Sequence, residues 1–173
     1  IKTIQYVCPQ FWAWRKGRVK RFKKYLDHIF SIFPFEENLL LEEGVSSNFT
    51  GHPLAENFEI EIDKQFYKQK LGFTEEKKFI ALLPGSRQSE IKNHLKILED
   101  LAKIYSSSKP NYQFILSLTN DNLISEEKYL EEKNITLIKG YTREVLKACD
   151  YAVVSSGTAT LEAMLSKTPF CVI

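Results

Sequence analysis

The chain has 173 residues, of which 43% are hydrophobic and 27% charged, which is typical of a globular protein and excludes a disordered or fibrous one. No apolar run approaches the roughly 20 residues needed to cross a bilayer, and the first residues do not resemble a signal peptide. The formal net charge of +2 is small, and the three cysteines fit neither a metal site nor a disulfide framework, so we expect a reducing, cytoplasmic setting.

Both ends of the chain look incomplete. The only methionine is Met164, and residues 169–173 are typical of a strand with no helix after it. A parallel strand that is buried on both faces needs a helix to cover it. We therefore expect one domain or parts of two, with protein missing on both sides.

The first 53 residues predict strands at 1–7, 28–33 and 45–49 and helices at 14–27 and 35–43. The first of these helices is strongly basic. Seven of the ten residues from Arg15 to Lys24 are Arg or Lys, and none is acidic. Such a segment indicates contact with an anionic lipid surface or a substrate phosphate, or else only a solvated helix face. Nucleic acid is disfavoured because the basic patch is single.

Residues 54–63 have no clear period and are interpreted as a connection between two domains. Beyond them, strands are predicted at 79–83, 113–118, 135–138, 151–155 and 170–173, and helices at 64–71, 125–133, 142–148 and 157–165. A long amphipathic helix with Ser89 as its N-cap lies between the first two of these strands. Strict alternation of strand and helix predicts a parallel, doubly wound sheet, in which ligands bind outside the carboxyl ends of the strands.

Two loops at predicted strand ends carry candidate binding residues. In the first, Gly85 and Ser86 follow a strand and Arg87 opens the long helix. A helix N-terminus together with an arginine favours an anion such as phosphate. The alternative is an ordinary glycine turn beside a surface arginine.

The second loop is rich in small residues, Ser155, Ser156, Gly157 and Thr158, and leads into a helix that carries Glu162. Its free amides suit a pyrophosphate, and Glu162 suits the hydroxyls of a ribose. A carboxylate near a helix N-terminus is also favourable for purely structural reasons. Neither loop has the Gly-Lys-Ser/Thr of a P-loop or the Gly-x-Gly-x-x-Gly of a dinucleotide site.

Other signals are weaker. His52, in a Thr-Gly-His-Pro turn, is either a general base or a turn residue. His28 and His94 have no partner pattern. No His, Cys or acidic cluster has metal-ligand spacing, so no metal and no cofactor are predicted.

Five sequence blocks together resemble the lipid-A-disaccharide synthase family. They occur in the family's order, at Tyr6–Arg15 with Gly17 and Arg18, Phe33–Glu36, Gly51–Leu54, Leu83–Arg87 with Ser89–Ile91, and Ser156–Glu162. The resemblance implies a GT-B fold with two Rossmann-like parallel-sheet domains, both incomplete here. Residues 1–53 would belong to the acceptor-side domain, 54–63 to the connection, and 64–173 to the UDP-sugar-binding domain.

The resemblance also implies a site. The expected UDP-binding residues are Gly85, Ser86, Arg87, Ser156, Gly157, Thr158, Ala159 and Glu162. The expected contacts to acceptor phosphate or membrane are Trp12, Trp14, Arg15 and Arg18. Cys8 stands where family members often carry Ser. The family's glycine-rich loop and catalytic acid are expected upstream of Ile1, and further nucleotide-binding loops are expected beyond Ile173.

The implied reaction moves 2,3-diacylglucosamine from UDP to 2,3-diacylglucosamine 1-phosphate (lipid X) with inversion, giving the β-1,6 disaccharide of lipid A and UDP. The implied partners are UDP-2,3-diacylglucosamine, lipid X and the anionic cytoplasmic face of the inner membrane of a Gram-negative bacterium. The resemblance leaves room for a homodimer. We expect the 173-residue chain alone to be inactive. The alternatives are another GT-B UDP-sugar transferase or epimerase, such as a peptidoglycan N-acetylglucosaminyltransferase, and a non-catalytic membrane-docking module.

Overall fold

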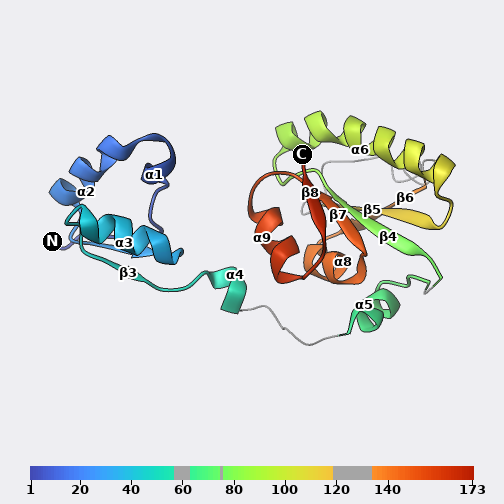
Figure 1. Cartoon of the computed structure of the whole chain (residues 1–173), viewed down its shortest axis with the longest axis horizontal. Helices are drawn as coiled ribbons and strands as arrows, with labels where there is room; N and C mark the ends of the chain where they lie inside the picture. The colour runs from blue at the N-terminus through green and yellow to red at the C-terminus, as the bar shows by residue number, and fades with distance from the viewer. Residues whose placement is uncertain (57–62, 75, 119–133) are drawn as a thin grey trace. The chain divides into compact units, whose positions relative to one another are not determined.

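The computed structural model describes residues 1–56, 63–74, 76–118 and 134–173. The chain divides into two compact units, Ile1–Phe58 and Glu59–Ile173 (Figure 1). The division falls inside the stretch 54–63 that the sequence marked as a connection. A short helix, α4 (Pro53–Glu56), opens this stretch, although the sequence there shows no helical period. The helix predicted at 125–133 lies outside the described residues.

The first unit is a three-stranded parallel sheet covered by short helices. Its strands β1 (Ile4–Tyr6), β2 (His28–Ser31) and β3 (Ser47–Phe49) lie in the order β1-β2-β3. The core contains Phe11, Phe22, Ile29 and Leu40. Helix α3 (Pro34–Glu42) begins with a proline, whose fixed φ suits the first helical position, and ends before Gly44.

The single basic helix predicted at 14–27 is wrong in detail. The segment is a short helix α1 (Phe11–Trp14), a 3-10 turn (Lys16–Arg18) and helix α2 (Val19–Tyr25). Arg15 between them has non-helical backbone angles, φ −145° and ψ 61°, which interrupt the helix. The break places Phe11 and Phe22 edge to face in the core, with ring centroids 5.7 Å apart. Burial of these two aromatic rings outweighs the helical propensity of the residues around Arg15.

The second unit is a five-stranded parallel sheet in the order β6-β5-β4-β7-β8. Its strands are β4 (Lys78–Leu83), β5 (Tyr112–Leu118), β6 (Ile135–Lys139), β7 (Tyr151–Val154) and β8 (Phe170–Val172). Its helices are α5 (Lys64–Lys70), α6 (Gln88–Ser108), α8 (Thr142–Ala148) and α9 (Thr158–Leu165). The predicted parallel, doubly wound sheet is confirmed.

Alternate residues of the central strand β4 point to opposite faces of the sheet. Ile80 and Leu82 pack with Leu98 of α6, whereas Phe79 and Ala81 pack with the residues of α8 and α9. Figure 1 shows α6 along one face of the sheet, with α8 and α9 on the other. Both faces of β4 are therefore buried, which explains its continuous apolar sequence.

A half-buried charged contact lies at one end of this sheet. Asp150, just before β7, accepts hydrogen bonds from Nζ of Lys64 at 2.6 Å and from the backbone N–H of Phe79 at 2.9 Å. Burial opposes ionisation of Asp150, but the bonds from Lys64 and Phe79 outweigh it, so the pKa of the carboxyl lies below its usual value. The contact ties α5 to the strand pair β4–β7. Among the helices described, none is both long and apolar enough to cross a membrane.

Candidate functional site

The site forms where the strand order of the second sheet changes direction. After β4 the chain adds β5 and then β6 on one side, and it returns to place β7 and β8 on the other. The carboxyl ends of β4 and β7 are consequently neighbours, with Leu83 paired to Val154. Ligands of doubly wound sheets bind at such a switch point, because the two loops diverge there and leave a crevice.

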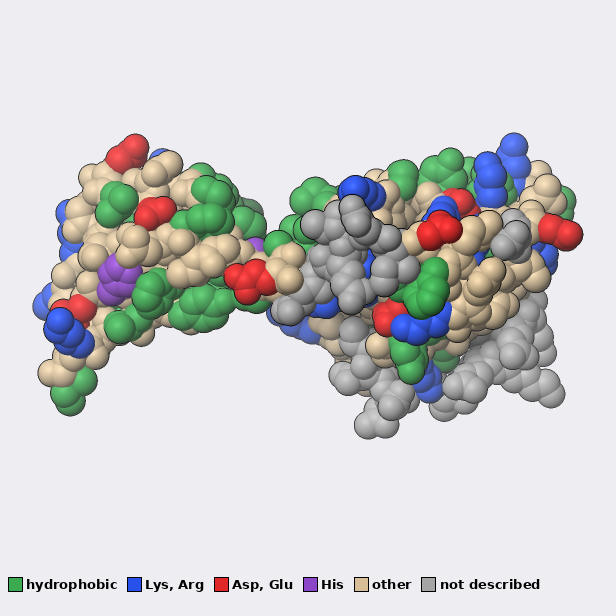
Figure 2. Space-filling view, turned by 90° about the horizontal axis from the view of Figure 1, so that it is seen from below, with side chains coloured by type: hydrophobic (Ala, Val, Ile, Leu, Met, Phe, Trp, Pro, Cys, Tyr) green, Lys and Arg blue, Asp and Glu red, His purple; other side chains and the backbone are tan. Residues whose placement is uncertain are grey.

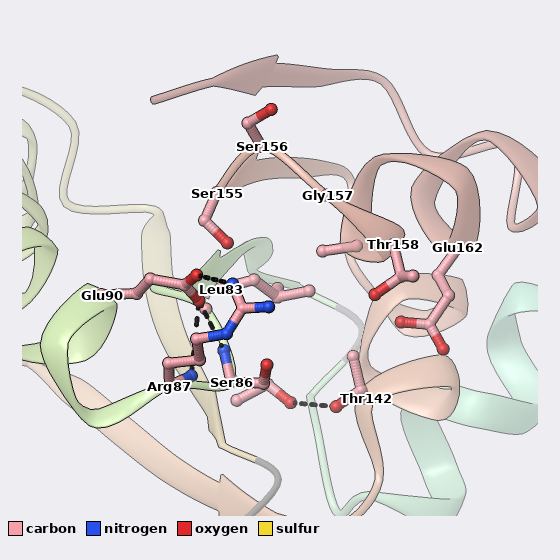
Figure 3. A pocket seen from close by; sticks show the side chains of 13 residues that line it. Leu83, Ser86, Arg87, Glu90, Thr142, Ser155, Ser156, Gly157, Thr158 and Glu162 are labelled. Carbon is pink, nitrogen blue, oxygen red and sulfur yellow. Dashed lines mark hydrogen bonds and ion pairs between the residues drawn. The ribbon is translucent and has the colours of Figure 1, made fainter. Parts of the chain in front are cut away.

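A cavity of about 290 Å³ opens between these two loops (Figure 3). This volume is near the lower limit of the usual range for small-molecule sites. Its lining is Leu83, Gly85, Ser86, Arg87, Glu90, Ser117, Thr142, Ser155, Ser156, Gly157, Thr158, Ala159 and Glu162. The structure therefore brings together all eight residues that the sequence assigned to UDP.

The first loop is organised by a carboxylate that the sequence reading missed. The N-cap predicted at Ser89 is wrong: α6 begins at Gln88, so Arg87 is the cap residue. Glu90 Oε2 instead accepts the backbone N–H groups of Ser86 at 3.2 Å and Arg87 at 3.3 Å. The Glu90 carboxylate accepts hydrogen bonds from two backbone N–H groups and one guanidinium, whereas a serine hydroxyl at the cap would accept only one.

Arg87 forms an ion pair with the same carboxylate. Its guanidinium Nη1 donates to Glu90 Oε1 at 2.7 Å, while 79% of the side chain stays exposed. These hydrogen bonds hold the pKa of the Glu90 carboxyl below its usual value. Figure 3 shows the Arg87 side chain reaching across the cavity lining with Glu90 beside it. The loop thus presents a fixed positive group to the cavity.

Gly85 is required in this loop for two reasons. Its φ of +116° is unfavourable for residues with a side chain. A Cβ atom placed there would lie 2.5 Å from Glu90 Oε2 and 2.8 Å from Glu90 Cβ. A second anchor comes from α6, where Nδ1 of His94 lies 2.7 Å from the carbonyl oxygen of Pro84. Because a carbonyl only accepts, this nitrogen carries the proton and donates it.

The second loop delivers backbone amides. Gly157, with φ +145°, precedes α9, and no side chain caps the start of that helix. Within the first turn of α9, the hydroxyl of Thr160 donates a hydrogen bond to the carbonyl oxygen of Gly157 at 2.7 Å. Thr158 and Ala159 line the cavity, and their amides belong to the first turn of α9, at the positive end of the helix dipole.

Glu162 lies on the same face of α9 as Thr158, one turn further on. Its Oε1 is 3.7 Å from Nε of Arg143 in α8, and its side chain is 20% exposed. Sequence reasoning missed Arg143, and it also missed Ser117 and Thr142, whose hydroxyls are 3.1 Å apart at the cavity wall. These residues come from β5 and α8, where no local motif marks them.

The candidate residues of the first unit divide into two groups by their exposure. Trp12 is half-buried: its Nε1 donates to Glu36 at 3.1 Å and its ring packs edge to face on Phe35. Trp14 is 85% exposed, and Arg15 and Arg18 are exposed beside it. Trp14, Arg15 and Arg18 are thus exposed to a ligand or a surface. His52 Nδ1 accepts the N–H of Leu54, as expected of a turn residue.

Within the described residues no group of three His, Cys, Asp or Glu side chains could hold a metal ion. Of the cysteines, Cys8 and Cys149 are buried and Cys171 is exposed. Burial raises the pKa of the Cys8 thiol to about 12, with a smaller contribution from Glu36, and it also raises that of Cys149.

Comparison with known proteins shows the family to which the sequence is similar. The chain is 38% identical to lipid-A-disaccharide synthase 1 of Legionella pneumophila over 100% of its own length and 46% of the relative. It is 37% identical to lipid-A-disaccharide synthase of Albidiferax ferrireducens over 99% of its length and 45% of the relative. The chain thus spans about half the length of the curated relatives it matches.

Among solved structures, the E. coli ADP-heptose lps heptosyltransferase II superposes with a TM-score of 0.48 at 12% identity, covering 94% of this chain and 67% of that chain. The profile of the family described as lipid-A-disaccharide synthetase matches residues 1–173, the whole chain. The resemblance seen in the five sequence blocks is confirmed, and the chain belongs to the lipid-A-disaccharide synthetase family.

Proposed function

We propose that this chain supplies the UDP-binding part of a GT-B glycosyltransferase of lipid A biosynthesis. The reaction proposed for the whole protein is transfer of 2,3-diacylglucosamine from UDP to lipid X with inversion. The observation that carries the proposal is the convergence of two loops, from β4 and β7, on one cavity with an arginine on one side and helix amides on the other.

The cavity suits a departing diphosphate. In the transition state, negative charge grows on the phosphate oxygen that leaves the sugar, and fixed donors that already point there stabilise it without reorganising. Arg87 provides a guanidinium that can bind two phosphate oxygens, and the amides of Thr158 and Ala159 provide the dipole of α9.

Glu162 suits the nucleoside. A carboxylate accepts hydrogen bonds from two adjacent hydroxyls, and the ribose of UDP presents such a pair. Arg143 beside Glu162 holds the carboxylate in place. The hydroxyls of Ser117 and Thr142 add donors and acceptors at the wall of the cavity.

The test is calorimetric titration of UDP into the whole protein that carries this chain. We expect Arg87→Ala and Glu162→Gln each to weaken UDP binding about fivefold or more, because a charged hydrogen bond contributes about 1 kcal/mol or more. The matched controls are Lys92→Ala, on the exposed side of α6, and Glu144→Gln, on α8. The Glu144 carboxylate pairs with Lys70 of α5. Unchanged affinity in both site variants would sink the nucleotide assignment.

The substrate is tested separately. A lipid-A-disaccharide synthase should use UDP-2,3-diacylglucosamine and should leave a UDP-glucosamine donor without acyl chains unused. The opposite preference would favour a peptidoglycan-type transferase or an epimerase, which share the small-residue loop and the helix acid.

We propose further that Trp14, Arg15 and Arg18 meet the anionic cytoplasmic surface of the inner membrane, where lipid X resides. An exposed tryptophan beside arginines is typical of a membrane-surface contact. Figure 2 shows further Lys and Arg side chains at the left end of the first unit, on the face seen from below.

Vesicle binding tests this contact. The chain should sediment with phosphatidylglycerol vesicles more than with phosphatidylcholine vesicles. Arg15→Glu with Arg18→Glu should weaken this binding by roughly thirtyfold or more, since each basic residue near such a surface contributes about 1 kcal/mol. Lys92→Glu with Lys103→Glu, on α6, is the charge-matched control, and an equal loss there would mean only a general charge effect.

A further inference from the structure

Glu90 is the one carboxylate that the cavity lining places against Arg87. It comes from the first turn of α6, and its two oxygens are used differently. One oxygen accepts from the guanidinium at 2.7 Å, and the other accepts the backbone N–H groups of Ser86 and Arg87. A single side chain thus occupies three of the donors that the sequence suggested for an anion.

This arrangement divides the donors of the site into two classes. The amides of Ser86 and Arg87, just before α6, already have an anionic partner inside the protein, so these two are withheld from a phosphate. The amides at the start of α9 have no capping side chain and line the cavity. The guanidinium of Arg87 uses one of its five N–H groups for Glu90, and four remain for a ligand.

Without Glu90 the guanidinium would have little to hold it. The Arg87 side chain is 79% exposed, and the Glu90 bond is the short contact that fixes its direction. A long, exposed side chain that is ordered only on binding loses rotamer freedom at that moment, which weakens binding. A guanidinium ordered beforehand avoids that cost.

We propose that Glu90 is a positioning residue of the nucleotide site: it aims the Arg87 guanidinium at the diphosphate and withholds the amides of Ser86 and Arg87 from it. This inference rests on the proposed function, because it concerns the same UDP site. Gly85 belongs to the same device, since only a residue without Cβ leaves room for the Glu90 carboxylate.

A double-mutant cycle on the whole protein tests the proposal, with UDP binding measured by calorimetry. We expect Glu90→Ala to weaken binding about tenfold and Arg87→Ala to weaken it at least as much. In the double variant, Glu90→Ala should add less than about twofold, because its effect passes through Arg87. A carboxylate that served only to cap α6 would cost the same factor in both backgrounds, and that result would overturn the proposal.

Glu90→Gln separates positioning from capping. The amide oxygen can still accept the N–H groups of Ser86 and Arg87, but the ion pair with the guanidinium is lost. We expect Glu90→Gln to weaken UDP binding at least fivefold while far-UV circular dichroism stays unchanged. Binding equal to the wild type, or tighter, would overturn the proposal and would mean that the negative charge only opposes the diphosphate.

The control variant is Asp100→Asn, which breaks an ion pair with Lys96 on the same helix away from the cavity, and its UDP affinity should not change. The wild-type titration separates the two levels of inference. Wild-type binding with unaffected Glu90 variants would overturn only the role of Glu90. No UDP binding by the wild type would overturn the proposed function and this inference together.

Discussion

Replacement of Gly85 by alanine should damage the second unit more than its size suggests. The backbone there has φ +116°, which costs a residue with a side chain about 1–3 kcal/mol. The new Cβ would also lie 2.8 Å from Cβ of Glu90, an atom fixed to the α6 backbone. Crowding of this kind costs about 1–3 kcal/mol more. We therefore expect a loss of about 2–6 kcal/mol, a large part of the roughly 5–15 kcal/mol that keeps a domain folded.

The assay is urea unfolding of the 173-residue chain with two probes. Both tryptophans, Trp12 and Trp14, belong to the first unit, so their fluorescence reports that unit, whereas circular dichroism reports both units. Gly85→Ala should lower the transition seen only by circular dichroism. Gly72→Ala is the matched control, because its φ is +71° but nothing lies within 4 Å of its added Cβ. That variant should lose only about 1 kcal/mol. Equal losses in the two variants would refute the steric part of the reasoning.

Three further predictions concern the second unit and the thiols. Asp150→Asn should cost about 1–3 kcal/mol of unfolding free energy at pH 7, because Lys64 and the buried Lys68 lose their anionic partner. Because folding lowers the pKa of Asp150, its contribution to the unfolding free energy is complete above the unfolded pKa near 4 and disappears as the pH falls through the folded pKa. The urea midpoints of wild type and variant should therefore converge below about pH 4. A difference between the midpoints that stays constant down to pH 2 would contradict this. Phe114→Ala should lower the unfolding free energy by about 3–5 kcal/mol in the same urea assay, because Phe114 is fully buried under α6. Phe66→Ala, at a half-exposed ring, should lower it by less than about 1 kcal/mol. Equal losses in the two variants would contradict the core assignment. Cys171 should react with a thiol reagent in the folded chain, whereas Cys8 and Cys149 should react only on unfolding, since burial keeps both protonated; mass spectrometry of the labelled chain would decide, and early labelling of Cys149 would contradict its burial.

Local sequence was sufficient where one strong signal dominated. The apolar run 79–83, stopped by Pro84 and Gly85, is β4, because a strand buried on both faces needs such a run. The alternation after it gave the parallel sheet, and the two loops met because carboxyl ends of parallel strands share one edge. These inferences needed only neighbouring residues and a general rule of topology.

Other features depended on contacts across the chain. Ser117 and Thr142 carry no motif, and their meeting at the cavity wall follows from the strand order, which local patterns do not reveal. Trp12 donates a hydrogen bond to Glu36, which is 24 residues away, so the residues next to Trp12 in the sequence could not predict this contact. Ser89 was predicted as a cap because serine is good at that position, yet the carboxylate of Glu90 could accept several donors at once.

The pairing of β4 with β7 has a consequence for synthesis and folding. The residues that close this pair, Phe79 and Asp150, are 71 positions apart, and β5, β6 and α8 are made between them. For the UDP site proposed above, a chain emerging from the ribosome would not hold nucleotide until nearly the whole second unit had been made and its long-range pairing had formed, a step that is slow for parallel sheets. Nucleotide would then stabilise only molecules that had finished folding, so UDP in the cell would act as a selective ligand for the completed unit.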